Sequence, residues 1–99
     1  MFWKIKSIKH TGTLGSRYED RIDDIYPERI GRIVSFIPTD ITVGQSFRIP
    51  YVKDANGAPM VFKALITSKV KSWAMNNDMF TVETKNSIYE FEYVDEEDV

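Results

Sequence analysis

The sequence of 99 residues predicts an all-β protein, a small and strongly bent antiparallel barrel. Short segments of alternating apolar and polar residues recur along the chain, with turn-forming residues between them at intervals of about 8–12 residues. In the second half, consecutive segments are joined by short turns that contain Asn and Asp, which tolerate turn conformations. A chain of this length has room for one domain with one modest core. An SH3-like barrel is the first expectation, and an OB-like barrel is the second.

The segment FRIPYVKDANGAPMVFKALI predicts a hairpin. Its turn is placed at Asn56-Gly57, because both central residues of a type I′ turn need positive φ. The register that follows puts Leu65 on the mixed outer face, opposite Arg48. The same register puts six apolar residues together on the inner face: Phe47 opposite Ile66, Ile49 opposite Ala64, and Tyr51 opposite Phe62.

Two further hairpins are predicted downstream, with turns at residues 77–78 and 85–86. Each hairpin gathers apolar and aromatic residues on one face, as a half-buried antiparallel ribbon requires. Together with the first hairpin they form a meander of four strands from about residue 46 to residue 94. The expected pairs are Met75–Phe80 and Trp73–Val82 in the first of these hairpins, and Phe80–Phe91, Val82–Tyr89 and Thr84–Ser87 in the second.

Two strands are expected upstream of the meander. FWKIKSIKH is rich in β-forming residues and puts Trp3 and Ile5 on one face. RIGRIVSFIP predicts a second strand, which Pro38 ends. Gly31 in this strand indicates a bulge or the close approach of another backbone. The apolar positions of the second strand are Ile30, Val34 and Phe36.

The segment between these two strands predicts a short helix at about residues 17–25. Ser16 followed by Glu19 matches a capping box, and Pro27 would end the helix. The apolar residues at helical spacing are Tyr18, Ile22, Ile25 and Tyr26. A structured loop that packs the same tyrosines onto the barrel is the alternative.

The segment ITSKVKSWAMNNDMFTVETKNSIYEF resembles a pattern of small proteins from Gram-positive bacteria and their phages or mobile elements. In that pattern, Thr-Ser precedes a valine strand, and after a turn a second strand ends in Thr-x-Asn-Ser-x-Tyr. Lys69 stands where those proteins have proline. The resemblance implies a small β-rich protein of unassigned role, and it transfers no catalytic residue. The matching positions are Thr67, Ser68, Val70, Thr84, Asn86, Ser87 and Tyr89.

Charge is unevenly distributed along the chain. The net charge is −2, but residues 90–99 hold six acids and no base. Residues 1–89 therefore hold 13 bases and 9 acids, a balance of +4. We expect a barrel domain over residues 1–94 and an acidic tail over residues 95–99. The tail is either a solvated chain end or a patch for a basic partner.

The composition argues against an enzyme. Without cysteine the chain has no disulfide, thiol nucleophile or thiolate metal site. His10 is the only histidine and is expected to be solvated. No Walker loop, Gly-rich nucleotide fingerprint or EF-hand spacing is present. We therefore expect no catalytic residue, no cofactor and no metal.

Localisation is expected to be cytoplasmic. The first ten residues alternate apolar and basic residues rather than forming the apolar run of a secretory signal. The chain also has no apolar run of the roughly 18 residues that would indicate a membrane span.

The functional expectation is a small non-catalytic module that binds another protein, of mobile-element origin if the resemblance holds. Val61, Leu65 and Ile88 are expected to face outward and to contribute to a modest interface. The alternative is a barrel that binds nucleic acid through a basic and aromatic surface. That tentative surface consists of Lys4, Lys6, Lys9, Arg48 and Trp73.

Overall fold

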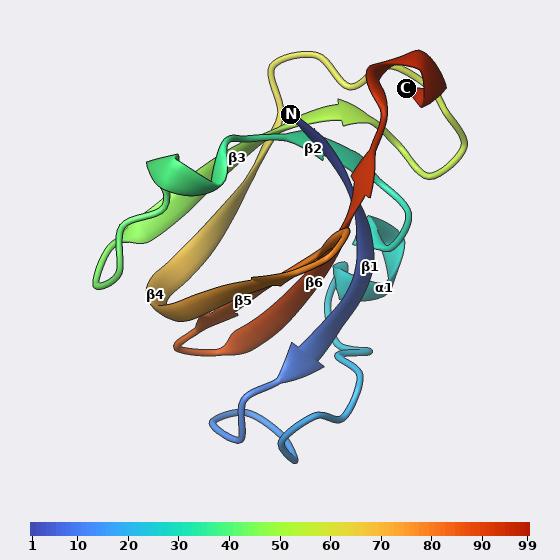
Figure 1. Cartoon of the computed structure of the whole chain (residues 1–99). Helices are drawn as coiled ribbons and strands as arrows, with labels where there is room; N and C mark the ends of the chain where they lie inside the picture. The colour runs from blue at the N-terminus through green and yellow to red at the C-terminus, as the bar shows by residue number, and fades with distance from the viewer.

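The computed structural model describes all 99 residues and shows a closed barrel of six antiparallel strands in chain order, with the last strand pairing onto the first (Figure 1). The predicted fold class is confirmed. One short helix, α1 (Tyr26–Arg29), and two 3-10 turns, η1 (Pro38–Asp40) and η2 (Glu96–Asp98), lie outside the barrel wall. The strands are β1 (Phe2–His10), β2 (Ile33–Ser35), β3 (Ser46–Lys53), β4 (Ala64–Asn76), β5 (Met79–Thr84) and β6 (Ser87–Val94).

The two downstream hairpins have the predicted register. Their short turns leave the strands little freedom to slip, and a slip would turn the apolar face outward. The confirmed pairs are Met75–Phe80, Trp73–Val82, Phe80–Phe91 and Val82–Tyr89.

No helix of the structure is long and apolar enough to cross a membrane.

The long strand β4 bends around one corner of the barrel. It pairs with β3 as far as Lys69 and with β5 from Val70 onward. The ladder shifts between Val70 and Ser72, where an extra residue increases the local twist. Figure 1 shows the change of direction in β4 at this corner. One strand therefore contributes to both halves of the barrel.

Aromatic rings fill the core. The indole of Trp3 stacks on Phe36, with ring centroids 5.1 Å apart, and its Nε1–H donates to the Phe36 carbonyl at 3.1 Å. Phe80 and Phe91 also contact Phe36, at 5.5 and 5.2 Å between centroids. Trp3 and Ile5 lie on the same inner face, as predicted, and both are buried.

The register between β3 and β4 differs from the prediction by one residue. Arg48 pairs with Ile66 rather than Leu65, and Ile49 pairs with Leu65 rather than Ala64. Because the side chains of a strand alternate between faces, Leu65 is buried and Ile66 is 69% exposed. The predicted inner face of β4 is therefore wrong, although Phe47, Ile49 and Tyr51 on β3 are buried as predicted.

The shift originates in the loop between β3 and β4. The carboxylate of Asp54 accepts hydrogen bonds from the backbone N–H groups of Asn56 and Ala58, so the turn is wider than the predicted two-residue one. Val61 and Phe62 then bulge out of the ladder, because pairing continues on both sides of them. The flanking backbone bonds are Met60 N to Val52 O at 3.0 Å and Tyr51 N to Lys63 O at 2.9 Å.

The predicted helix over residues 17–25 is wrong, and the segment is the alternative structured loop, in which Tyr26 packs against the barrel core as expected but Tyr18 is 62% exposed. The loop runs beside β1, with bonds from His10 N to Glu19 O at 2.8 Å and from Arg21 N to Ile8 O at 2.9 Å. These bonds to β1 use backbone groups that a helix would pair internally. The helix α1 begins instead at Tyr26, with proline in its first turn, where the missing N–H costs nothing.

Gly31 shows the close backbone approach that its position predicted. Its φ is +89°, and its N–H donates to the Ile5 carbonyl at 2.8 Å. A Cβ at this position would lie 3.2 Å from the Cβ of Ala55. Glycine therefore lets the loop after β3 pack against the start of β2.

Candidate functional site

The three lysines of the predicted surface lie on β1, beside acidic residues of β6. Lys6 Nζ lies 3.7 Å from Glu92 Oε2, and Lys9 Nζ lies 3.2 Å from Glu90 Oε1. Lys4 is the direct cross-strand neighbour of Glu92. The basic strand is therefore largely neutralised by its own neighbour in the barrel.

The other two residues of that surface lie elsewhere. Arg48 is exposed on β3, and the strand order places β2 between β3 and β1. Trp73 on β4 stacks on Phe80, with ring centroids 5.3 Å apart, and is 42% exposed. Because β5 and β6 separate β4 from β1, the barrel does not bring the five residues onto one surface.

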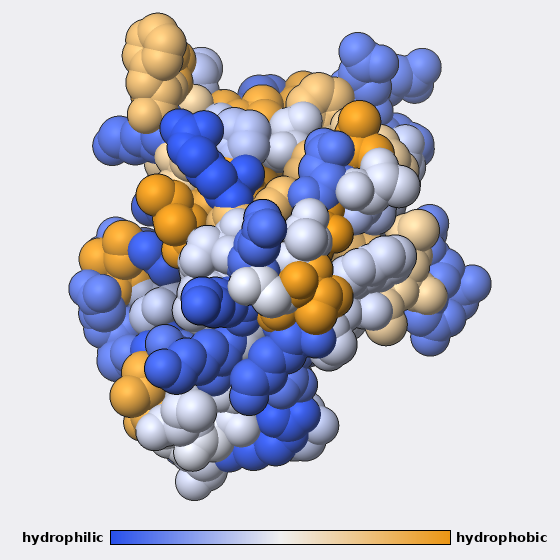
Figure 2. All heavy atoms as spheres, turned by 90° about the vertical axis from the view of Figure 1, so that its left-hand side faces the viewer, coloured by the Kyte–Doolittle hydropathy of each residue, from blue (hydrophilic) through white to orange (hydrophobic).

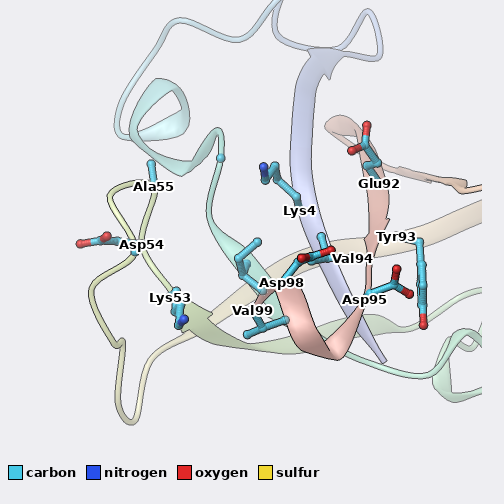
Figure 3. Close-up of a pocket in the computed structure, with 13 residues that line it drawn as sticks. Lys4, Lys53, Asp54, Ala55, Glu92, Tyr93, Val94, Asp95, Asp98 and Val99 are labelled. Carbon is cyan, nitrogen blue, oxygen red and sulfur yellow. The ribbon is translucent and has the colours of Figure 1, made fainter.

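A groove of about 470 Å³ lies where the acidic C-terminal segment turns back toward the barrel. Figure 3 shows Asp98 and Val99 between Lys53 on one side and Glu92 on the other. The groove contains both charge signs, and no group of three or more His, Cys, Asp or Glu side chains converges anywhere in the molecule. Its charged lining residues are Lys4, Lys53, Asp54, Glu92, Asp95 and Asp98.

Two of the three apolar residues that were expected to face outward are buried. Leu65 is buried because of the register shift described above, and Ile88 is 5% exposed. Ile88 is the cross-strand neighbour of Glu83, and the loop after β1 crosses this face. There Arg17 binds Glu83 through two bonds of 3.1 and 2.7 Å, which lower the pKa of that carboxyl. Val61 alone is exposed as expected, at 64%.

His10 is buried rather than solvated, because the loop after β1 covers it. A Cβ on Gly15 would lie 2.8 Å from the imidazole, so the loop backbone packs on the ring. His10 Nε2 lies 3.8 Å from Asp23 Oδ1. The carboxylate of Asp23 is committed to Arg21, at 3.2 and 2.7 Å, and this hydrogen bonding lowers its pKa. Ser87, the cross-strand neighbour of His10, has the hydroxyl of this cluster, but it is buried and its Oγ accepts a hydrogen bond from Arg21, so we interpret the cluster as the anchor of the loop.

Arg21 is the centre of this anchor. It is 5% exposed, donates to Ser87 Oγ at 2.7 Å, and lies 3.8 Å from the ring centroid of Tyr26. Burial lowers its pKa, but the hydrogen bond to Asp23 together with the Coulombic attraction of Tyr26, Asp23 and Tyr89 outweighs burial and raises the pKa overall. Burial also raises the pKa of the nearby Tyr89 to about 12. Arg21 therefore stays charged and Tyr89 neutral at any ordinary pH.

The most unusual surface feature is the bulge in the β3–β4 loop. Phe62 is 99% exposed and has a φ of +61°. A bulky residue in the left-handed region is an outlier, because its Cβ crowds the carbonyl oxygen. Val61 beside it is 64% exposed. We call residues 60–63 the apolar loop.

On the face around the β4 bend, exposed apolar side chains are more dispersed. Figure 2 views the molecule from the side of the β4 bend, and the hydrophobic groups there are interspersed with hydrophilic ones. Val43, in the connection between β2 and β3, is 57% exposed. Single exposed apolar residues are common on protein surfaces and do not identify an interface by themselves. Tyr18 also combines exposure, at 62%, with a positive φ of 69°, but the Arg17 guanidinium carbon lies 4.7 Å from its ring centroid. The apolar loop differs because the Phe62 ring is almost wholly exposed and lies next to a second exposed apolar residue, Val61.

Comparisons with protein-family models, with curated proteins and with solved structures found no match for this chain. The resemblance of the β4–β6 segment to small Gram-positive and phage proteins therefore stays an expectation.

Proposed function

We propose that this protein is a non-catalytic module that docks another protein over its apolar loop. The observation that carries the proposal is Phe62, an aromatic side chain almost wholly in solvent on a left-handed backbone. Aromatic side chains dominate binding energy at protein interfaces, where they fill pockets on the partner. They bring a large apolar area with only two side-chain torsions to immobilise.

The barrel itself gives no reason for phenylalanine at this position. The exposed ring stabilises no core, and glycine or asparagine would adopt the left-handed conformation at lower cost. Backbone strain that the fold does not need is typical of binding sites, where it presents a side chain in a fixed direction. Burial of Phe62 and Val61 in a complex would recover the apolar area that folding leaves exposed.

The alternative proposal, nucleic-acid binding, has less support from the geometry. Its lysines face Glu90 and Glu92, and its arginine and tryptophan lie on other strands. A phosphate backbone is usually met by clustered cations that are free to release its counterions. The apolar loop offers one aromatic ring but no such cluster on β1.

The same proposal includes three more specific assignments: the type of barrel, the cellular location and the origin of the protein. The strongly bent β4, which serves both halves of the barrel, supports the SH3-like description. The absence of cysteine is consistent with a reducing cytoplasm. An origin in a Gram-positive bacterium or its mobile elements follows from the resemblance of the β4–β6 segment.

Photo-cross-linking in the cells that encode the protein tests the docking proposal. A photoreactive residue replaces Phe62 in one variant and Val43, an exposed residue outside the loop, in the other. We expect one protein adduct at position 62 and none at position 43. The purified partner should then bind Phe62→Ala at least tenfold more weakly than the wild type, and Val43→Ala as tightly. Equal adducts at both positions, or nuclease-sensitive adducts only, would contradict the proposal.

A further inference from the structure

A basic pocket of about 360 Å³ opens beside the apolar loop, where α1, β3 and the start of β4 meet. The last residue of the loop, Lys63, is part of its wall. Arg29 comes from the end of α1, Arg32 from the segment before β2, and Tyr51 from β3. The remaining lining residues are the apolar Ile25, Met60 and Ala64.

The pocket has an uncompensated positive charge. It is lined by three cationic side chains and no acid. None of the ion pairs of the protein includes Arg29, Arg32 or Lys63. Like charges held together repel one another, and this repulsion grows as water is excluded. An anion bound among them would remove that repulsion.

The pocket also concentrates buried donors without partners. Four buried side-chain polar atoms in the protein have no hydrogen bond, and three of them belong to the lining of this pocket. They are Nε of Arg29, Nε of Arg32 and Oη of Tyr51, whereas the fourth is Nδ1 of His10. Tyr51 is only 8% exposed. Buried donors without partners are rare, so three around one pocket indicate a ligand that accepts hydrogen bonds.

Aromatic rings hold both guanidinium groups in place. The Arg29 guanidinium carbon lies 4.7 Å from the ring centroid of Tyr26, and that of Arg32 lies 4.9 Å from the ring centroid of Tyr51. Stacking of this kind is specific to arginine and leaves the edges of the guanidinium free for hydrogen bonds. The donors are thus oriented before any ligand arrives, which lowers the entropic cost of binding.

We propose that this pocket binds a phosphate monoester carried by a side chain of the docked protein. A phosphate dianion has three terminal oxygens and a charge near −2, and so suits three cations and a phenol better than a carboxylate does. The adjoining Phe62 and Ile25 are apolar neighbours for the residues on either side of the phosphorylated one. The inference that a docked protein carries the phosphate rests on the proposed function, whereas the inference that the pocket recognises a phosphate group rests on the pocket alone.

An amide NMR titration of the whole labelled protein tests the proposal at low ionic strength and about pH 7.5, where a phosphate monoester is mostly dianionic. The probes are N-acetyl-phosphoserine amide, its unphosphorylated analogue, inorganic phosphate, and an oligothymidylate without terminal phosphate. We expect the phosphoserine compound to shift amides around residues 29–32 and 60–64, and the serine compound to shift none. No shift there at millimolar phosphoserine compound would overturn the proposal.

Substitutions inside and outside the pocket distinguish binding by the pocket from general attraction to surface charge. Arg29→Gln and Lys63→Gln should each weaken phosphoserine binding by about tenfold, as expected for a lost charge-assisted hydrogen bond. Arg48→Gln, an exposed arginine outside the pocket, is the matched control and should bind normally. Equal weakening in Arg48→Gln would show general charge attraction and overturn the proposal.

The remaining outcomes distinguish the sources of phosphate. Tighter binding of oligothymidylate than of the phosphoserine compound, with the same shifted amides, would overturn the protein source in favour of nucleic acid. Binding of inorganic phosphate alone would overturn it in favour of a free anion. Phe62→Ala should leave phosphoserine binding unchanged, so failure of the docking proposal and failure of the pocket are separately visible.

Discussion

Replacement of Phe62 by glycine should leave the barrel as stable as the wild type or slightly more stable, although it removes a large apolar side chain. The ring is 99% exposed, so its removal loses almost no burial. The left-handed backbone of a non-glycine residue costs about 1–2 kcal/mol, and glycine avoids that cost. Glycine gives the unfolded chain more freedom, which offsets about 0.5–1 kcal/mol of the gain. The net expectation is an increase of about 0.5 kcal/mol in the free energy of unfolding.

A matched control lies in the same β3–β4 loop. Gly57 has a φ of +85°, and a Cβ there would meet no atom within 4 Å. Gly57→Ala therefore adds a Cβ to a left-handed residue without any clash, and should cost about 1 kcal/mol. Phe62→Ala keeps the strained backbone and loses no burial, so its stability should change by less than about 0.5 kcal/mol. The three variants separate the contribution of the ring from that of the backbone.

Urea unfolding followed by tryptophan fluorescence provides the measurement, because Trp3 is buried in the core. With an m-value of about 1–3 kcal/mol per molar urea, a change of 1 kcal/mol moves the urea midpoint by roughly 0.3–1 M, so these effects are measurable. A loss of more than about 1 kcal/mol in Phe62→Gly would refute the reasoning. That result would mean that the ring packs on the barrel and is part of the fold.

Two further predictions concern the barrel wall. Phe80→Ala should destabilise the protein by about 3–5 kcal/mol, because Phe80 is fully buried against Trp3 and removal of its ring leaves a cavity in the core. A loss below about 1 kcal/mol in the free energy of unfolding, measured by thermal unfolding, would contradict the described core. Glu90 accepts a hydrogen bond from Ser7 at 2.7 Å and pairs with Lys9, and both lower its pKa below the ordinary value of 4.5. A lowered folded-state pKa stabilises the protein above the unfolded pKa, and this stabilisation is lost as the pH falls through the folded one. Glu90→Gln should therefore be less stable than the wild type by about 0.5–1 kcal/mol near pH 7, and the difference should vanish near pH 3; a difference independent of pH would contradict this origin.

Sequence patterns predicted the downstream hairpins because their registers are set locally. Each turn there joins two strands whose apolar residues lie on the same face of the sheet in only one register. The β3–β4 hairpin was mispredicted because the side chain of Asp54 reorganises the turn, and the bulge at Val61 and Phe62 then moves β4 by one residue. Neither effect is visible in the alternation of apolar and polar residues.

The helix prediction failed for a tertiary reason. The apolar spacing from Tyr18 to Tyr26 suits a helix, but the buried Arg21 and the bonds between the loop and β1 favour an extended path. Local propensity is a weak prior when tertiary contacts supply alternative partners for the backbone. The pattern predicts that Pro27 ends a helix, whereas Pro27 lies in the first turn of one.

The basic pocket could not be predicted from the sequence. Arg29 and Arg32 lie in a stretch where acids and bases alternate, a pattern that by itself indicates a locally balanced, solvated surface. Only the path of the chain around the barrel brings Lys63 and Tyr51 to them. The available signal was the lack of any acid after Glu28 within this stretch, which leaves the two arginines without a local partner.

The most direct test of the account is to map the surface that meets the cross-linked partner. Amide signals of the labelled protein are followed as the purified partner is added. Broadening and shifts are expected to concentrate on residues 60–63, the apolar loop, and on residues 29–32 and Ala64 of the basic pocket beside it. A response centred on β1 around Lys4, Lys6 and Lys9, with the apolar loop unchanged, would contradict it.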